Sequence, residues 1–294
     1  MLNFMNNEKI FAEAMAEFEK FRINAESFCK IREKDGIALI RIKSGGKSFV
    51  FKYFKNADFR REIRIYQILE ETGIETVKIH AATEKSILME DISESETLRL
   101  GKEEDMSDPE VAKALAKWYK KLHAAGYKYL PMHNESFYSE NAVITRENLA
   151  FIKSATKTEN ISVWKIIEDN FEKIKSAIES EKYTFNYNDF YYTNLVVARD
   201  KSKAFMFDYN LFGKGTAASD INNVCWSLSE DAKKSFLDEY GKIYEHEKFV
   251  AETAMVLSSL FFACKREEFP DWGKPILEEF KSGYINKIKS LIEL

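Results

Sequence analysis

The segment that most constrains this chain is 187–220, where three oxygen-bearing side chains stand on two loops. Asp189 and Asn194 precede a strand-like stretch at 195–198, and Asp208 follows a second such stretch. A β-hairpin formed by the two stretches would bring the three side chains together. Phosphoryl transfer needs this set, with one carboxylate at the attacking hydroxyl, and an amide oxygen and another carboxylate holding Mg²⁺. The pattern alone is weak evidence, because such polar residues also cap ordinary turns.

Two upstream segments supply further parts of such a site. Residues 48–54 alternate like a strand and carry Lys52 among apolar and aromatic neighbours. The next segment, 58–72, has helical spacing and places Glu62 on its first turns. A lysine on a strand and a glutamate on the following helix can form the ion pair that holds the lysine toward nucleotide phosphates.

A third upstream segment, 86–92, has the pattern of a buried strand that runs into a polar connector. Backbone groups of such a connector could bind an adenine edge. The residues expected there are Glu90, Asp91 and Ile92. Because all these elements occur in the order of a kinase site, we interpret them together as a phosphoryl-transfer site.

In these motifs the chain resembles the aminoglycoside phosphotransferase and choline kinase family, the small-molecule branch of the protein-kinase-like fold. The resemblance runs from about residue 27 to 226 and is most specific in 187–223, where Asp208 is followed by Asp220 much as in the family's closing motif. The resemblance implies the role of each residue that matches a family motif. These residues are the catalytic Asp189, the metal ligands Asn194 and Asp208, the phosphate-binding Lys52, its partner Glu62, and Asp220, which braces the catalytic loop.

Two departures from the family pattern concern the catalytic and nucleotide loops. Tyr187 occupies a position that is commonly histidine, so it supports the catalytic loop without an imidazole. The nucleotide loop has a single glycine, in the turn Asp35-Gly36, and offers fewer backbone amides to phosphates. His123 matches a family helix and is expected to be structural. The departures admit an alternative: a degenerate kinase-like nucleotide-binding or scaffold protein without turnover.

We expect an α+β protein with the two-lobe, protein-kinase-like fold. The N-terminal lobe, at 1–91, is expected to be a small antiparallel sheet that binds the nucleotide. The C-terminal lobe, at 92–294, is expected to be mainly helical and to contain the catalytic loop, metal site and acceptor pocket. The strands are expected at 27–32, 38–43, 48–54, 78–83 and 86–90. The helices are expected at 8–22, 58–72, 161–179, 230–244, 247–264 and 276–294, with another that begins near Pro109 and ends near Gly126.

The function predicted from this site is transfer of the γ-phosphoryl group of ATP, or of GTP, to a hydroxyl of a small molecule with the help of Mg²⁺. Aromatic faces beside carboxylates suit a cationic acceptor, so choline-like, aminoglycoside-like and homoserine-like acceptors remain open. Simple helix packing is the alternative for each aromatic residue. The candidate walls of the acceptor pocket are Tyr191, Tyr192, Trp226, Trp272 and Tyr284, with Glu230 and Asp271 as nearby acids.

Composition excludes some other classes of function. The 44 basic and 48 acidic residues give a net charge of −4, which argues against a nucleic-acid partner. Three scattered cysteines, Cys29, Cys225 and Cys264, indicate reduced thiols in a cytoplasmic protein. No signal-peptide pattern and no apolar run of about 20 residues is present, so no membrane association is expected. The oligomeric state is left open.

Overall fold

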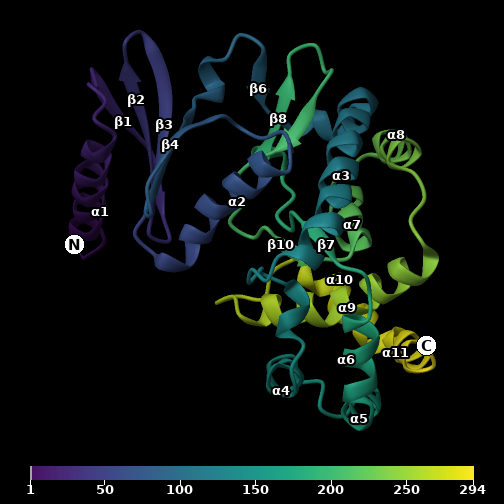
Figure 1. Ribbon diagram of the computed structural model, residues 1–294. Coiled ribbons are helices and arrows are strands. Elements are labelled where there is room, and N and C mark those ends of the chain that lie inside the picture. Colours follow the sequence, from purple (N-terminus) through teal and green to yellow (C-terminus); the bar gives the residue numbers. More distant parts are fainter. Residues whose placement is uncertain (1) are drawn as a thin grey trace. The chain divides into compact units, whose positions relative to one another are not determined.

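The computed structural model describes the backbone of residues 2–294 and the side chains from residue 10 onward (Figure 1). The chain forms two compact units. The first contains the residues up to 121 together with 189–212 and 227–240, and the second contains 122–188, 213–226 and the residues from 241. The boundary predicted after residue 91 divides the chain at one point, whereas each compact unit combines several segments of the chain. The predicted division into two lobes stays a prediction.

The first unit contains a five-stranded antiparallel sheet with the strand order β1-β2-β3-β5-β4. Each predicted strand is present, and its ends lie within two residues of the expected ones. The alternation of apolar and polar residues therefore identified these strands correctly. The strands are β1 (Ser27–Lys34), β2 (Ile37–Ser44), β3 (Lys47–Phe54), β4 (Ile79–Ala82) and β5 (Ser86–Glu90).

The two faces of this sheet have different roles. On one face, alternate residues of β2 such as Ile40 and Ile42 are fully buried in a core that includes Phe18 of α1 (Leu2–Phe18). The helix α1 lies along this face and is followed by a short 3-10 turn (Figure 1). Lys52 pairs directly with Leu39 across β3 and β2, on the opposite face. Burial of one face by α1 thus leaves the Lys52 face for other contacts.

The remaining parts of the first unit include α2 (Arg61–Glu71), α8 (Glu230–Tyr240) and a three-stranded sheet. The predicted hairpin is confirmed, because β8 (Leu195–Ala198) pairs antiparallel with β9 (Ala204–Met206). The third strand, β6 (Leu98–Leu100), pairs with β8. The Phe207 amide donates to the Asn194 carbonyl at 3.0 Å, so the two loops that carry Asn194 and Asp208 meet at one end of the hairpin.

The second unit is mainly helical and contains one two-stranded sheet. Its core packs Trp164, Leu257, Phe280 and Tyr284 together. Its elements are the C-terminal end of α3 (Pro109–Tyr129), α4 (Arg146–Ala155), α5 (Val163–Asp169), α6 (Phe171–Glu179), the paired strands β7 (Thr184–Asn186) and β10 (Gly213–Gly215), α7 (Ala217–Ser227), α9 (Glu245–Cys264), α10 (Gly273–Ser282) and α11 (Tyr284–Ile292).

Several helix predictions were wrong in detail. The helix expected at 8–22 begins at Leu2 and ends at Phe18, and the helix expected at 230–244 ends at Tyr240. The expected helices at 161–179 and 276–294 are each two helices, which break at Asn170 and Gly283. At the first break, the Asn170 side chain donates to the Ile166 carbonyl at 3.0 Å and so caps the end of α5. Gly126 does not end α3, which continues to Tyr129. The residue is needed for close packing, because a Cβ there would overlap the Phe185 backbone. Among the described helices, none combines the length and apolar character that a membrane-spanning segment needs.

Candidate active site

Lys52 is the centre of a buried ion-pair network in the first unit. Its side chain extends from β3, and the residue is only 3% exposed. The ammonium donates to both carboxylate oxygens of Glu62, at 2.8 and 2.6 Å, and to Oδ1 of Asp208 at 2.7 Å. Burial alone would lower the pKa of Lys52, but the two carboxylates outweigh burial and raise it. Lys52 is therefore held as a fixed positive charge.

Glu62 is fully buried on the first turn of α2. Burial raises the pKa of its carboxyl to about 7, and the Lys52 ammonium opposes a further rise. A buried carboxylate of this kind is stable in the charged form only beside a hydrogen-bonded cation. Lys52 and Glu62 therefore stabilise each other's charged form, and they make the ion pair that the sequence predicted.

Asp189 and Asn194 stand together at the start of the β8–β9 hairpin. The Asn194 side-chain amide donates to the carbonyl oxygen and to Oδ2 of Asp189, both at 3.2 Å. Burial and the like charge of Asp208 raise the pKa of Asp189. Two carboxylates close enough to repel each other favour a cation between or beside them.

Asp208 follows β9 in the left-handed backbone region, with φ of +63°. Its Oδ1 accepts from Lys52 and also from the Asn210 side chain, at 2.5 Å. The Arg61 guanidinium donates to the Asn210 carbonyl, which ties this loop to α2. The strained residue is thus held from both sides, a situation typical of functional loops.

Lys52, Asp189, Asn194 and Asp208 line one open pocket of about 390 Å³ within the first unit. The sequence interpretation missed several of its residues, including Arg32, Lys34 and Asn210. Arg32 and Lys34 could have been found by counting strand register outward from the two-residue turn at 35–36. The turn places Arg32 opposite Leu39, and Leu39 in turn lies opposite Lys52. The pocket is lined by Arg32, Lys34, Asp35, Ile37, Leu39, Lys52, Phe59, Asp189, Tyr191, Thr193, Asn194, Asp208, Asn210 and Leu211.

The connector expected to bind adenine, Glu90-Asp91-Ile92, does not line this pocket. Asp91 is buried and accepts hydrogen bonds from Arg41 at 2.6 Å and from Ser48 at 2.7 Å. These bonds lower its pKa against the effect of burial. The side chain therefore fastens the connector to the sheet, and adenine binding by the connector backbone stays a prediction.

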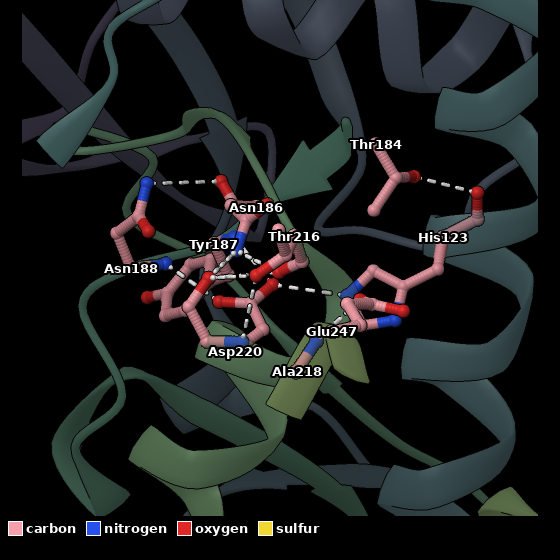
Figure 2. Close-up of polar contacts among 10 residues, drawn as sticks. His123, Thr184, Asn186, Tyr187, Asn188, Thr216, Ala218, Asp220 and Glu247 are labelled. Atoms are coloured by element: carbon pink, nitrogen blue, oxygen red, sulfur yellow. Dashed lines mark hydrogen bonds and ion pairs between the residues drawn. The ribbon is translucent and has the colours of Figure 1, made fainter. Parts of the chain in front are cut away.

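Asp220 organises a second polar cluster, within the second unit (Figure 2). It is 1% exposed, and its two oxygens accept from the backbone amides of Tyr187, at 2.8 Å, and Asn188, at 3.0 Å. The His123 ring nitrogen Nε2 lies 3.1 Å from Oδ2. The carboxylate thus fixes the backbone of the two residues that immediately precede Asp189 in the chain. His123 brings an imidazole to this cluster from α3, while the Tyr187 ring is fully buried.

The aromatic residues expected to form an acceptor pocket differ in their exposure and surroundings. Tyr191 is 61% exposed and lines the pocket of the first unit, whereas Tyr192 does not. Trp226 on α7 and Trp272 at the start of α10 are both exposed residues of the second unit. Tyr284 is fully buried in the helical core and hydrogen-bonds the Thr253 carbonyl, so the expectation that it forms a wall was wrong. The other assignments stay predictions.

The donor set beside the Asp189 carboxylate suits Mg²⁺. The described residues contain no cluster of three or more histidine, cysteine or acidic side chains that could enclose a metal ion. Mg²⁺ does not need such a cluster, because it usually takes one or two carboxylates and completes its shell with water and substrate phosphates. The Asp208 carboxylate and the amide oxygen of Asn194 are donors of the type that could hold this ion, and a cation would offset the repulsion between Asp189 and Asp208.

Comparison with known proteins identifies the family and the fold of this chain. The sequence model of the phosphotransferase enzyme family matches residues 39–255, so the chain belongs to this family. No curated protein matched the sequence. The family and the protein-kinase-like fold predicted from the sequence are thereby confirmed.

Solved structures of low sequence identity share the fold. Choline kinase LicA from Streptococcus pneumoniae is 14% identical, with a TM-score of 0.61 over 97% of this chain and 99% of that one. A putative fructosamine-3-kinase from Thermobifida fusca is 13% identical, with a TM-score of 0.60 over 92% and 95% of the two chains. A spectinomycin phosphotransferase, solved with ADP and spectinomycin, is 15% identical, with a TM-score of 0.51 over 92% and 95%.

Proposed function

We propose that this phosphotransferase transfers the γ-phosphoryl group of ATP to a hydroxyl group of a small molecule. One observation carries the proposal: Lys52, Asp189, Asn194 and Asp208 line a single pocket, and Lys52 is fixed there by a buried ion pair with Glu62. Phosphoryl transfer is catalysed mainly by positioning and by stabilising charge, and this pocket supplies the groups for both.

Each of these residues has one part in the reaction. Lys52 provides a fixed positive charge for the nucleotide phosphates. Asp189 orients the acceptor hydroxyl and accepts its proton late, because a loose transition state leaves little need for early deprotonation. Asn194 holds the Asp189 side chain, and its amide oxygen together with the Asp208 carboxylate would hold Mg²⁺. The metal ion, when bound, supplies positive charge that neutralises the phosphate oxygens.

The nucleotide is proposed to be ATP, with GTP as the alternative donor. The spectinomycin phosphotransferase with the same fold was solved with ADP, which supports an adenine nucleotide. The pocket offers Ile37, Leu39 and Phe59 as apolar walls beside its charged residues. Such a mixture suits a ligand with a flat base and a charged phosphate chain.

The acceptor is proposed to be a small hydroxyl compound that bears an amine. Tyr191 presents an exposed aromatic face at the pocket, and such a face attracts organic cations. Solved structures of the same fold are named for choline, ethanolamine and spectinomycin as the compounds they act on. Choline-like, aminoglycoside-like and homoserine-like compounds therefore form the first set to test.

Two assays in sequence test the function. A thermal-shift assay with ATP and Mg²⁺ should raise the melting temperature, because a ligand that binds only the folded state stabilises it. A coupled ADP-release screen across amino alcohols, amino sugars and amino acids should then identify the acceptor. Asp189→Ala is expected to abolish turnover while ATP still raises the melting temperature. Turnover by Asp189→Ala close to that of the unaltered protein would reject the catalytic assignment, and ATP binding without turnover of any acceptor would favour the scaffold alternative.

A further inference from the structure

The pocket wall formed by the β1–β2 hairpin carries two cations. Arg32 on β1 pairs with Leu39 on β2, which pairs with Lys52 on β3. Directly paired residues lie on the same face of a sheet, and neighbouring strands are about 4.8 Å apart, so Arg32 and Lys52 stand about 10 Å apart at the backbone. Lys34, two residues on, shares this face. All three side chains line the same pocket.

The two hairpin cations are available for a ligand. Arg32 and Lys34 are both exposed. The Arg32 side chain forms no hydrogen bond or ion pair with any residue that the structure describes. Lys34 has a single loose ion pair, at 3.8 Å, with its neighbour Asp35. Neither cation is committed to holding the fold together, in contrast to the buried Lys52.

Charge along the pocket wall favours these two cations as contacts for a polyphosphate. Without Arg32 and Lys34, one lysine would face three carboxylates, and the wall would repel a phosphate chain. With them, cationic and acidic groups are equal in number before Mg²⁺ adds its charge. The charged side chains that line the pocket are Arg32, Lys34 and Lys52, and Asp35, Asp189 and Asp208.

The hairpin turn itself is poorly suited to bind phosphates through its backbone. It contains Gly36 as its single glycine, at φ of +80°, preceded by Asp35 at φ of +54°. The Gly36 carbonyl accepts from the Lys55 amide at 2.9 Å, and the Gly36 α-carbon lies against Asn56. The turn is thus held to the residues that follow β3, while Arg32 and Lys34, on the strand that leads into it, line the pocket.

We propose that Arg32 and Lys34 bind the polyphosphate of the nucleotide and take the place of the glycine-rich backbone contacts that this turn lacks. Arg32 is the principal contact, because its guanidinium can donate two hydrogen bonds to one phosphate. The proposal rests on the proposed function, since it needs a nucleotide in this pocket. It assigns to two exposed strand residues the specificity for nucleotides with a phosphate chain over nucleosides.

Titration of ATP and of adenosine into the protein by calorimetry, with Mg²⁺ present, tests this proposal. Arg32→Ala is expected to raise the Kd for ATP by about tenfold to a hundredfold, because one charge-assisted contact is lost. The Kd for adenosine, which has no phosphate, should be unchanged. Lys34→Ala should raise the Kd for ATP by about threefold to tenfold, because Asp35 already shares its charge. Arg32→Lys should recover part of the affinity.

Lys30→Ala is the matched control on the same strand. Lys30 pairs with Ile40, whose side chain faces the core beneath α1, and it forms an ion pair with Glu33 at 3.2 Å. A bulge at Ile31 puts Lys30 and Arg32 on opposite faces, so Lys30→Ala should leave both Kd values unchanged. Equal ATP affinity for Arg32→Ala and Lys30→Ala would overturn the proposal while the kinase function stands. Absence of ATP binding by the unaltered protein would overturn both.

Discussion

Replacing Lys52 by methionine should make the stability of the protein strongly dependent on pH above neutrality. In the unaltered protein, Glu62 has a pKa of about 7, so above pH 7 its carboxylate is ionised beside Lys52. The carboxyl is also ionised in the unfolded chain, where its ordinary pKa is 4.5. Above pH 7, the carboxyl of Glu62 therefore binds no proton in either the folded or the unfolded state. This residue then adds no pH dependence to the free energy of unfolding.

In Lys52→Met the cation that opposes burial is gone, so the pKa of Glu62 rises further. The folded state then keeps one proton that the unfolded state has lost, and the free energy of unfolding falls as pH rises. The slope is about 1.4 kcal/mol per pH unit, or about 2.7 kcal/mol between pH 7 and pH 9. The total loss should approach the about 3–5 kcal/mol expected when one partner of a buried ion pair is removed.

Urea denaturation of the variant and the unaltered protein at both pH values measures this effect. Lys52→Met combined with Glu62→Gln should abolish the added slope, since no carboxylate remains to bind the proton. Lys55→Met is the matched control, because Lys55 pairs with Glu13 at the surface and should lose less than about 1 kcal/mol. If Lys52→Met is destabilised equally at pH 7 and pH 9, the argument from the buried Lys52–Glu62 pair is refuted.

Two further variants test the carboxylates beside the proposed chemistry. Asp208→Asn should lower the pKa of Asp189, because it removes the like charge that helps raise that pKa. A ¹³C NMR titration of the Asp189 carboxyl in metal-free protein measures the shift. An unchanged or higher pKa would contradict the prediction. Asp220→Asn should lower the free energy of unfolding by about 1–3 kcal/mol, since its side chain has one acceptor oxygen, and either the Tyr187 or the Asn188 backbone amide then faces an NH₂ group that cannot accept. Urea denaturation checks this, and wild-type stability would show that these hydrogen bonds contribute little.

Local sequence patterns were sufficient to predict the elements that carry the site. The strand β2 alternates clearly between buried and less buried residues because α1 covers one face of the sheet, and Lys52 of β3 lies on the other face. The hairpin between Asn194 and Asp208 followed from two short apolar runs separated by a polar turn. These features depend on residues close together in the chain, where periodicity and turn chemistry determine the structure.

Features that depend on distant residues could not be predicted. The apolar periodicity continues across Asn170, so the break between α5 and α6 had no signal apart from one side-chain cap. The contact between His123 and Asp220 joins residues 97 positions apart. The bulge at Ile31 separates Lys30 from Arg32 only once β1 is paired with β2. Each of these depends on tertiary packing, which a single sequence does not specify locally.

A crystal structure of the protein with Mg²⁺ and a non-hydrolysable ATP analogue tests the central claim most directly. The account predicts that the metal ion binds Asp208 and the Asn194 side-chain oxygen, that Lys52 contacts a phosphate, and that Asp189 faces the γ-phosphate. A nucleotide bound away from the pocket that contains these four side chains, or a metal ion held by other residues, would contradict it.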